Sequence, residues 1–306
     1  MEGEYLHMVD ILVRAGCFVA IILLGVILRR AGFFKREDFH ILSRIVINIT
    51  LPAAVITNFA GRELDRSLLL LIPAGLLYGV VIMFTAWALN RRRGSEAQAF
   101  AVLNSSGVNI GNFVLPFAQG FLGPAGVVAV SLFDVGNGTI CLGGAYAVAG
   151  LIHEKRRGFS ILPILRTLVR SVPFMTYVIM CLLTLFHINL PGPFLSLAGI
   201  ISNANAFLAM LMLGVGFRIE TKRIGEAVRV LLPRYLIGFA CAALCWFLMP
   251  EMYRVALIIP FLGPVASAAP AYTAQLDGDY ELASAINSFS ILLSIVLIVA
   301  VLLITA

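Results

Sequence analysis

Apolar residues run along this chain in stretches of about 20 residues, the length of helix that crosses a bilayer. Charged or turn-forming residues separate the stretches, and the pattern predicts ten membrane-spanning helices. We place them at residues 8–28, 39–59, 68–89, 97–121, 125–151, 171–187, 194–216, 230–249, 252–275 and 281–304. The sequence therefore predicts an all-α integral membrane protein.

Two of the predicted spans are interrupted by glycine, proline and small polar residues. One reads AFAVLNSSGVNIGNFVLPFAQGF from Ala99 to Phe121, and the other reads VALIIPFLGPVASAAPAYTAQL from Val255 to Leu276. Such breaks free backbone groups that hydrocarbon cannot satisfy, so we expect them to face protein or a wet cavity. Broken spans at matching places in the two halves of a chain are typical of the substrate site of a secondary transporter.

The two halves of the chain show a weak internal repeat. A shift of about 155 residues aligns Asn48 with Asn203, and nearly the same shift aligns Pro116 with Pro270. Each half holds an odd number of predicted spans, so the halves enter the membrane with opposite polarity. We predict one transmembrane domain built as two inverted five-helix repeats, with repeat one at about 1–152, a cytoplasmic linker at about 153–170 and repeat two at about 171–306.

Composition agrees with a membrane protein. Hydrophobic residues make up 60% of the chain and charged residues 12%, against roughly 45–50% and 25% in soluble domains. No polar stretch is long enough to fold as a separate soluble domain. The cysteines all lie in apolar stretches, which favours plain packing, and we expect no metal and no cofactor.

Lysine and arginine predict the orientation, because basic loops stay on the cytoplasmic side. With this rule both termini lie outside, in a multi-pass protein of the cytoplasmic (inner) membrane. The net charge of +6 then reflects topology and contact with membrane lipids, and no nucleic-acid partner is expected. The basic residues assigned to the cytoplasmic loops are Arg29, Arg30, Lys35, Arg36, Arg91, Arg92, Arg93, Lys155, Arg156, Arg157, Arg166, Arg170, Arg218, Lys222, Arg223, Arg229 and Arg234.

Small polar residues in the two breaks are candidates for substrate binding. If the breaks cross, two half-helix N-termini meet, and each carries about half a positive charge that favours an anion. Neither break contains lysine or arginine, so backbone N–H groups and neutral amides would hold the anion. The candidates are Asn109, Gly111, Asn112 and Pro116 in the first break and Ser267 and Pro270 in the second.

A second set of polar residues lies outside the two breaks or at their margin. Asp134 stands alone deep in an apolar span, where it could couple transport to a proton or ion, or hydrogen-bond Asn137 or a neighbouring helix. Pro52 is expected to kink its helix. Cavity lining and interhelical packing remain equally open for Asn48, Pro52 and Asn203, whereas for Asn104 and Ser105 a functional role such as cavity lining is favoured over packing.

Four motifs together resemble the auxin efflux carrier family, the bacterial relatives of the plant PIN auxin transporters. They are NITLPA at 48–53, GNFVLP at 111–116, the break around Pro270, and the acidic turn that leads into ELAS at 281–284. The resemblance implies a scaffold subdomain, a transport subdomain with crossed broken helices four and nine, and dimerisation through the scaffold. It also implies an organic anion such as malate, malonate or an auxin-like carboxylate, bound where Asn112, Pro116 and Pro270 meet.

The predicted function is secondary transport of a small organic anion by alternating access. The alternative is a cation/proton antiporter or an ion-coupled symporter of the related inverted-repeat fold. Such antiporters generally carry paired carboxylates or a lysine at the crossing point, whereas Asp134 stands alone. The sequence contains no Gly-x-Ser-x-Gly or His-Glu-x-x-His motif, so we do not expect an enzyme.

Overall fold

The structure is a computed structural model that describes residues 2–35, 37–62, 64–153, 161–218 and 223–305. These residues form helices and one isolated β bridge. In chain order the elements, with π or 3-10 turns marked η, are α1 (Glu2–Arg30), α2 (Asp38–Ile45), η1 (Val46–Thr50), α3 (Leu51–Phe59), η2 (Arg66–Leu70), α4 (Leu71–Asn90), α5 (Ser95–Ser105), η3 (Ile110–Val114), α6 (Leu115–Phe121), α7 (Gly123–Thr139), η4 (Ile140–Gly144), α8 (Ala145–Ile152), α9 (Ile161–Arg170), α10 (Val172–Leu185), α11 (Gly192–Ser202), α12 (Asn205–Gly216), α13 (Ile224–Leu248), α14 (Glu251–Phe261), α15 (Ala269–Gln275) and α16 (Tyr280–Ile304).

Seven helices of the described chain are long and apolar enough to cross a membrane, or eight if the bent pair α9 and α10 counts as one span. This confirms the all-helical, multi-pass class. The predicted count of ten is not confirmed, because the predicted spans 97–121 and 252–275 are each divided into two short helices. The first becomes α5 followed by η3 and α6, and the second becomes α14 and α15.

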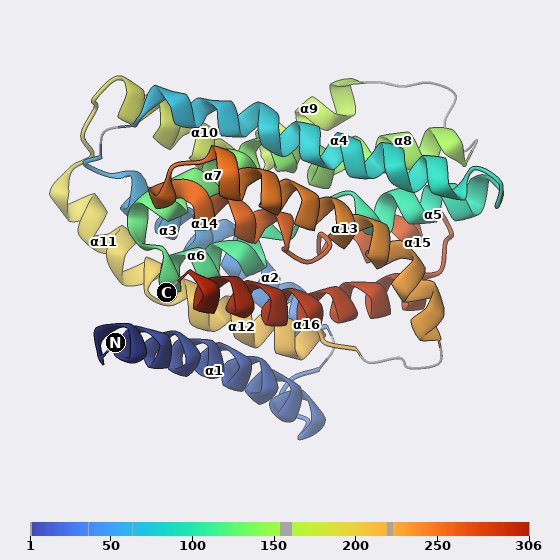
Figure 1. The fold of residues 1–306 in the computed structure, drawn as a ribbon, viewed down its shortest axis with the longest axis horizontal. Helices are drawn as coiled ribbons and strands as arrows, with labels where there is room; N and C mark the ends of the chain where they lie inside the picture. The colour runs from blue at the N-terminus through green and yellow to red at the C-terminus, as the bar shows by residue number, and fades with distance from the viewer. Residues whose placement is uncertain (1, 36, 63, 154–160, 219–222, 306) are drawn as a thin grey trace.

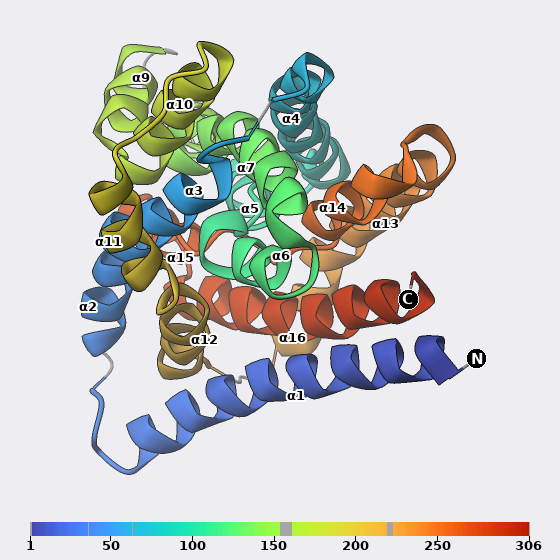
Figure 2. The ribbon, with the colours of Figure 1, turned by 90° about the vertical axis from the view of Figure 1, so that its left-hand side faces the viewer.

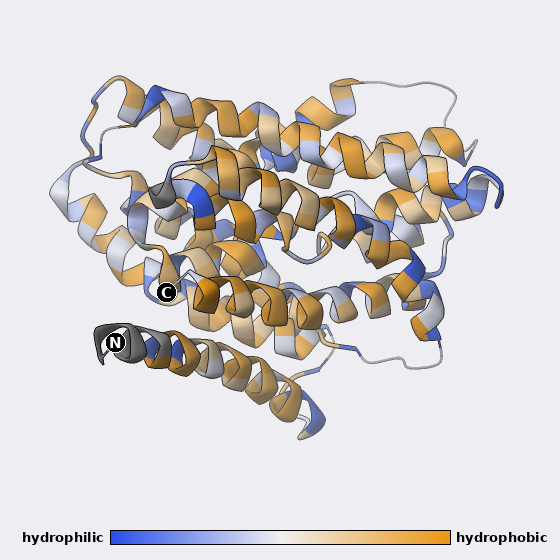
Figure 3. Cartoon of the chain, in the orientation of Figure 1, coloured by the Kyte–Doolittle hydropathy of each residue, from blue (hydrophilic) through white to orange (hydrophobic). Residues whose placement is uncertain are grey.

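Many helices run along the long axis in Figure 1, whereas Figure 2 shows α1 and α16 strongly tilted from it; the start of α1 and the end of α16 lie at the same end of the bundle. The turn between α4 and α5 lies at the opposite end and carries the exposed Arg91, Arg92 and Arg93. Figure 3 shows apolar residues along the outer helix faces and polar residues gathered at that turn. Lipid solvates an apolar outer surface of this kind, which agrees with a multi-pass membrane protein.

Glycines let two pairs of helices pack with their backbones in contact. A Cβ on Gly136 of α7 would lie 1.9 Å from a backbone oxygen of α4, and one on Gly75 of α4 would lie 2.1 Å from a backbone oxygen of α7. Gly25 of α1 and Gly214 of α12 meet in the same way, at 2.5 and 2.0 Å. Close approach of this kind replaces the hydrophobic effect as the source of helix association in lipid.

Pro52 and Pro116 each follow a π-helical turn. In both places the sequence reads Asn-x-x-Leu-Pro, and η1 or η3 ends two residues before the proline. Proline cannot donate the backbone hydrogen bond of a regular helix, and the wider turn takes up the mismatch. The kink expected at Pro52 therefore takes the form of a π turn inside a span that continues from Asp38 to Phe59.

The basic loops differ from the prediction in two places. The linker expected at 153–170 contains the helix α9, which meets α10 at 77°. Arg229 and Arg234 were assigned to a loop, which is wrong, because both lie inside α13. The basic residues Arg36, Lys155, Arg156, Arg157 and Lys222 lie outside the described residues.

Candidate functional site

The two interrupted spans meet at their breaks. Val108 and Val265 form an antiparallel β bridge, and the Asn109 N–H donates to the Pro264 carbonyl at 2.9 Å. The Ala266 N–H donates to the carbonyl of Gly107 at 3.1 Å. We call residues 105–109 and 261–268 the crossover. It brings together the C-terminal ends of α5 and α14 and the N-terminal ends of η3 and α15.

Side chains of surrounding helices satisfy every carbonyl of residues 261–266. Tyr78 donates to the Phe261 carbonyl at 2.8 Å, and Ser294 donates to the Leu262 carbonyl at 2.7 Å. Arg234 donates to the carbonyls of Gly263 and Pro264 at 2.9 and 3.2 Å. Asn287 donates to the carbonyls of Val265 and Ala266 at 2.9 and 3.3 Å. These hydrogen bonds explain how an irregular backbone is tolerated at membrane depth, where an unpaired carbonyl group costs free energy.

Arg234 is the residue at the crossover that the sequence reading missed. Its side chain is fully buried, with 0% exposure. It also donates to the carbonyls of Ser105 and Gly107 in the first break, so one guanidinium binds both breaks. The sequence offered one signal, because Arg234 lies inside the predicted span 230–249; the structure places it about three turns inside α13.

Asp134 is connected to the crossover through Asn137. Asn137 Nδ2 donates to Asp134 Oδ1 at 2.8 Å and to the Val108 carbonyl at 2.9 Å. Asn137 Oδ1 accepts from the Val108 N–H at 3.0 Å. On the other side, the Tyr177 hydroxyl of α10 donates to Asp134 Oδ2 at 3.0 Å. Asp134 thus makes both contacts that its hydrogen-bonding interpretation names, one to Asn137 and one to a neighbouring helix.

A cavity of about 160 Å³ lies beside the crossover. Its walls are formed by η1, α3, η3, α7, η4 and α10, together with the residues just before α15. Cys141 and Phe174 contribute to its wall. Five of the predicted site residues line it, namely Asn109, Gly111, Asn112, Asp134 and Ser267.

Two polar atoms of this cavity's lining residues are buried without a hydrogen-bond partner among the residues that the structure describes. They are Asn109 Nδ2 and Asn112 Oδ1. Asn112 Nδ2 is used, since it donates to Ser267 Oγ at 3.2 Å and so links the two breaks. Buried polar groups are rarely left unpaired because the desolvation cost is about 1–3 kcal/mol. A bound molecule in the cavity would supply the missing partners.

The two prolines proposed for substrate binding do not line this cavity. Pro116 is buried in the first turn of α6. Pro270 borders a neighbouring cavity of about 230 Å³ between α12, α15 and α16. Ser267 borders both cavities. The prolines therefore shape the two breaks, and the side chains of Asn109, Asn112 and Ser267 provide the polar groups.

The residues proposed only for cavity lining lie elsewhere. Asn48 is exposed and donates to the Arg44 carbonyl of its own helix at 2.9 Å. Asn104 is buried and donates to Thr273 Oγ1 at 3.0 Å. The other three residues do not line the cavity beside the crossover either. Pro52 is buried in α3, and the Ser105 carbonyl accepts a hydrogen bond from Arg234. Asn203 is exposed at the end of α11.

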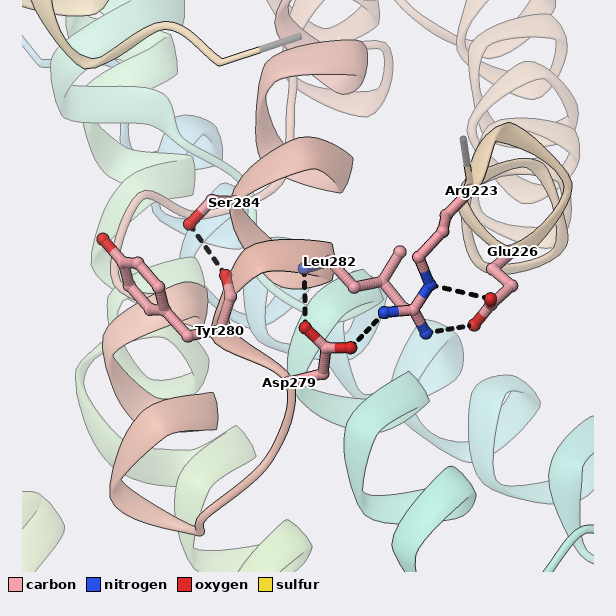
Figure 4. Close-up of polar contacts among 6 residues, drawn as sticks. All are labelled: Arg223, Glu226, Asp279, Tyr280, Leu282 and Ser284. Atoms are coloured by element: carbon pink, nitrogen blue, oxygen red, sulfur yellow. Dashed lines mark hydrogen bonds and ion pairs between the residues drawn. The ribbon is translucent and has the colours of Figure 1, made fainter. Parts of the chain in front are cut away.

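A larger cavity of about 360 Å³ lies at the end of the bundle that carries the α4–α5 turn. Its charged residues include Arg223, which bonds Glu226 at 2.8 Å and also pairs with Asp279 (Figure 4). Asp279 caps α16 by accepting from the Leu282 N–H at 2.9 Å. Burial raises the pKa of Asp279, but the hydrogen bonds from the Leu282 N–H and from Arg223 lower it by more. The pKa of Asp279 therefore lies below its ordinary value. These charges satisfy one another, so we place the functional site at the smaller cavity.

Comparison with known proteins agrees with a transport function. Residues 17–156 match the profile of a family described as membrane transport protein. An uncharacterized transporter of Methanothermobacter thermautotrophicus is 26% identical over 289 residues, which cover 91% of this chain and 93% of the relative. The family match confirms the resemblance drawn from the sequence motifs.

Proposed function

Because residues 17–156 match the profile of a family described as membrane transport protein, we propose that the protein is a secondary carrier of a small organic anion. The observation that carries the proposal is the buried Asn109 Nδ2, a hydrogen-bond donor without a partner in the described chain, on a residue that lines the cavity beside the crossover. Carboxylate oxygens accept such bonds. In this reading the protein is a carrier and not an enzyme.

Apart from Asp134, whose carboxyl group must be protonated to avoid repulsion, the groups that border the cavity favour an anion. The N-terminal end of η3, which continues into α6, borders the cavity through Ile110, Gly111 and Asn112. Its first N–H groups have no carbonyl partner within the helix, and the helix dipole makes this end positive. Neutral amides and dipoles bind more weakly than an ion pair does, which suits a carrier that must release its cargo.

The size of the cavity limits the substrate. A volume of about 160 Å³ is several times the roughly 30 Å³ that one water molecule occupies in the liquid. A small mono- or dicarboxylate of the malonate or malate kind fits such a volume. An auxin-like carboxylate would need the neighbouring cavity of about 230 Å³, which Ser267 also borders.

Two hydrogen bonds support the inverted repeat. Thr50 donates to Asn205 at 2.9 Å, and Asn112 donates to Ser267 at 3.2 Å. Both pairs are separated by 155 residues, the shift that aligns the two halves of the sequence. Equivalent residues touch one another only near a two-fold axis, so the repeats would be related by an axis that passes close to the crossover.

Alternating access would then move the crossover against the helices that face it. The cavity is lined on one side by crossover residues and on the other by Ile47, Leu51 and Phe174 from η1, α3 and α10. We assign α1 to α3 and α10 to α12 to the scaffold, and the remaining spans to the transport subdomain. Rigid movement of one group against the other exposes a fixed site to each side in turn.

An ion-coupled symporter is a second candidate, and Asp134 favours it. Its carboxyl group shares the cavity with Asn109 and Asn112. A cation/proton antiporter is less well supported, because no second carboxylate and no lysine lines this cavity in the described chain. The second candidate function is therefore symport of the anion with a proton that binds to Asp134, and its test is given in the Discussion.

Uptake into proteoliposomes tests the proposed function. With purified protein in the bilayer and malonate or malate inside, we expect saturable exchange of radiolabelled malonate, malate or indole-3-acetate. Neutral malonamide serves as the control, because it has the shape of malonate without its charge, and it should not compete. Proton release on addition of Na⁺, K⁺ or Li⁺, without uptake of any carboxylate, would instead establish the antiporter.

Thiol labelling tests the orientation, which we propose has both termini outside. In a background without native cysteines, Arg92→Cys in the α4–α5 turn should resist an impermeant thiol reagent added to whole cells and react in inverted vesicles. Gly192→Cys, at the start of α11, is the control and should show the opposite pattern. Labelling of Arg92→Cys in whole cells would invert the proposed topology.

A further inference from the structure

We propose that Arg234 is the positioning residue of the transport site, which clamps the two broken spans together at the crossover and neutralises their negative helix ends. This inference rests on the proposed function, since it concerns the same site. Nothing in the sequence motifs or in the family match points to this residue. Its role follows from geometry and charge.

Both terminal nitrogens of the guanidinium bind the two breaks, while its buried Nε has no partner among the described residues. Nη1 donates to the carbonyls of Ser105 and Gly107, and Nη2 donates to those of Gly263 and Pro264. Ser105 is the last residue of α5 and Gly107 follows this helix, whereas Gly263 and Pro264 follow α14. The side chain therefore connects segments that are about half the chain apart. Only the planar fork of arginine offers four donors in this arrangement, because lysine has three on one atom.

Charge gives the second reason for an arginine at this position. The C-terminal end of a helix carries about half a negative charge, and two such ends converge here. Arg234 is fully buried and forms no ion pair in the described part of the chain. A buried cation without a carboxylate is costly unless other groups stabilise it. The paired carbonyl dipoles do so, and the cation in turn cancels the negative ends.

The clamp has a direct consequence for the cavity. With the C-terminal ends neutralised, their negative charge no longer opposes the positive N-terminal end of η3 on the cavity side. The clamped backbone also fixes Val108 and Asn109, since the peptide after Gly107 continues to the β bridge and to the unpartnered Asn109 amide. Arg234 thereby positions the anion-binding groups without lining the cavity itself.

A native cysteine can report on the clamp without any substrate. Cys141 lines the cavity, and its Sγ lies 3.5 Å from the Val108 carbonyl. Its side chain also fills the space beside Gly107, where an added Cβ would lie 2.6 Å from Sγ. Loosening of the crossover would therefore expose this thiol. Replacement of the other four cysteines, Cys17, Cys181, Cys241 and Cys245, by alanine leaves Cys141 as the single reporter.

The experiment compares Arg234→Gln, Arg234→Lys and the matched control Arg229→Gln in the single-cysteine background. Arg229 lies on the same helix but is exposed. We expect N-ethylmaleimide to label Cys141 about tenfold faster in Arg234→Gln, since charge-assisted hydrogen bonds are lost. Arg234→Lys should give an intermediate rate, and Arg229→Gln the parental rate. Labelling is measured well below the thermal midpoint of each variant, so that unfolding does not contribute.

Several results would overturn the clamp. One is an unchanged Cys141 rate in Arg234→Gln. Another is failure of even Arg234→Lys to fold, since the residue would then serve the whole fold. Malonate exchange is measured in parallel, and Arg234→Lys should raise its half-saturation concentration more than it lowers the maximal rate. A clamp confirmed by labelling in a protein that exchanges no carboxylate would reject the proposed function and retain the clamp.

Discussion

Replacement of Asp134 with asparagine is expected to abolish accumulation driven by a pH gradient while leaving anion exchange intact. The carboxyl group lines the same cavity as Asn109 and Asn112. A bound anion and an ionised Asp134 would repel each other across this small volume. Uptake of a proton together with the anion removes the repulsion, so the geometry favours anion–proton symport.

The pH dependence follows from this linkage. In the parent protein, anion binding should tighten as the pH falls, because the proton is taken up with the anion. The other titratable groups around the carboxyl are Tyr177 of α10 and Cys141 of η4, and the fixed charge nearest along the hydrogen-bonded chain is Arg234. Asp134→Asn keeps the side-chain shape and should bind the anion with no pH dependence.

Proteoliposomes loaded at different internal pH measure the effect. With one coupled proton, a gradient of about one pH unit supports up to about tenfold accumulation of malonate. Asp134→Asn should reduce this ratio to about one, the value for exchange alone. Tyr177→Phe is the matched control, since it removes one hydrogen bond and leaves the carboxyl group. Undiminished accumulation in Asp134→Asn would assign Asp134 to helix packing and favour facilitated diffusion.

Asn109→Ala is expected to weaken anion binding by about 1–3 kcal/mol, which corresponds to roughly 5- to 150-fold in affinity. The physical reason is the loss of a buried donor that the protein itself leaves unpaired. Asn109→Asp is isosteric and places a negative charge at the same point, so it should abolish binding. Asn112→Ala should also weaken binding, because Asn112 links η3 to Ser267 and lines the same cavity.

The control for these variants is Asn48→Ala. Asn48 is an exposed amide that bonds within its own helix, so its loss should leave affinity unchanged. Equilibrium binding of radiolabelled malonate to purified protein gives the affinities, and the thermal midpoint checks folding. Normal affinity in both Asn109 variants would place the anion away from the crossover, with the neighbouring cavity beside Ser267 as the next candidate.

The sequence alone located most helices and both breaks. Long apolar runs define the spans because hydrocarbon thickness fixes their length, and this holds without knowledge of the neighbours. The predicted spans 39–59, 194–216 and 281–304 agree with the structure within about two residues. The interruptions near Asn109 and Pro270 could also be predicted from the local sequence, because glycine and proline disrupt the helix in which they themselves lie. Asp134 was found for the same reason, as a lone charge in an apolar run.

Only the tertiary structure decided which polar side chains serve the crossover. Asn48 and Asn205 look alike in the sequence, but Asn48 is exposed, whereas Asn205 is buried and bonds Thr50 and Gln119. Arg234 was counted with the basic loop residues, although it lies near the start of the predicted span 230–249. Its partners are backbone carbonyls, which every residue has, so no sequence pattern identifies them. The breaks were determined by local backbone chemistry, and the groups that satisfy them by long-range packing.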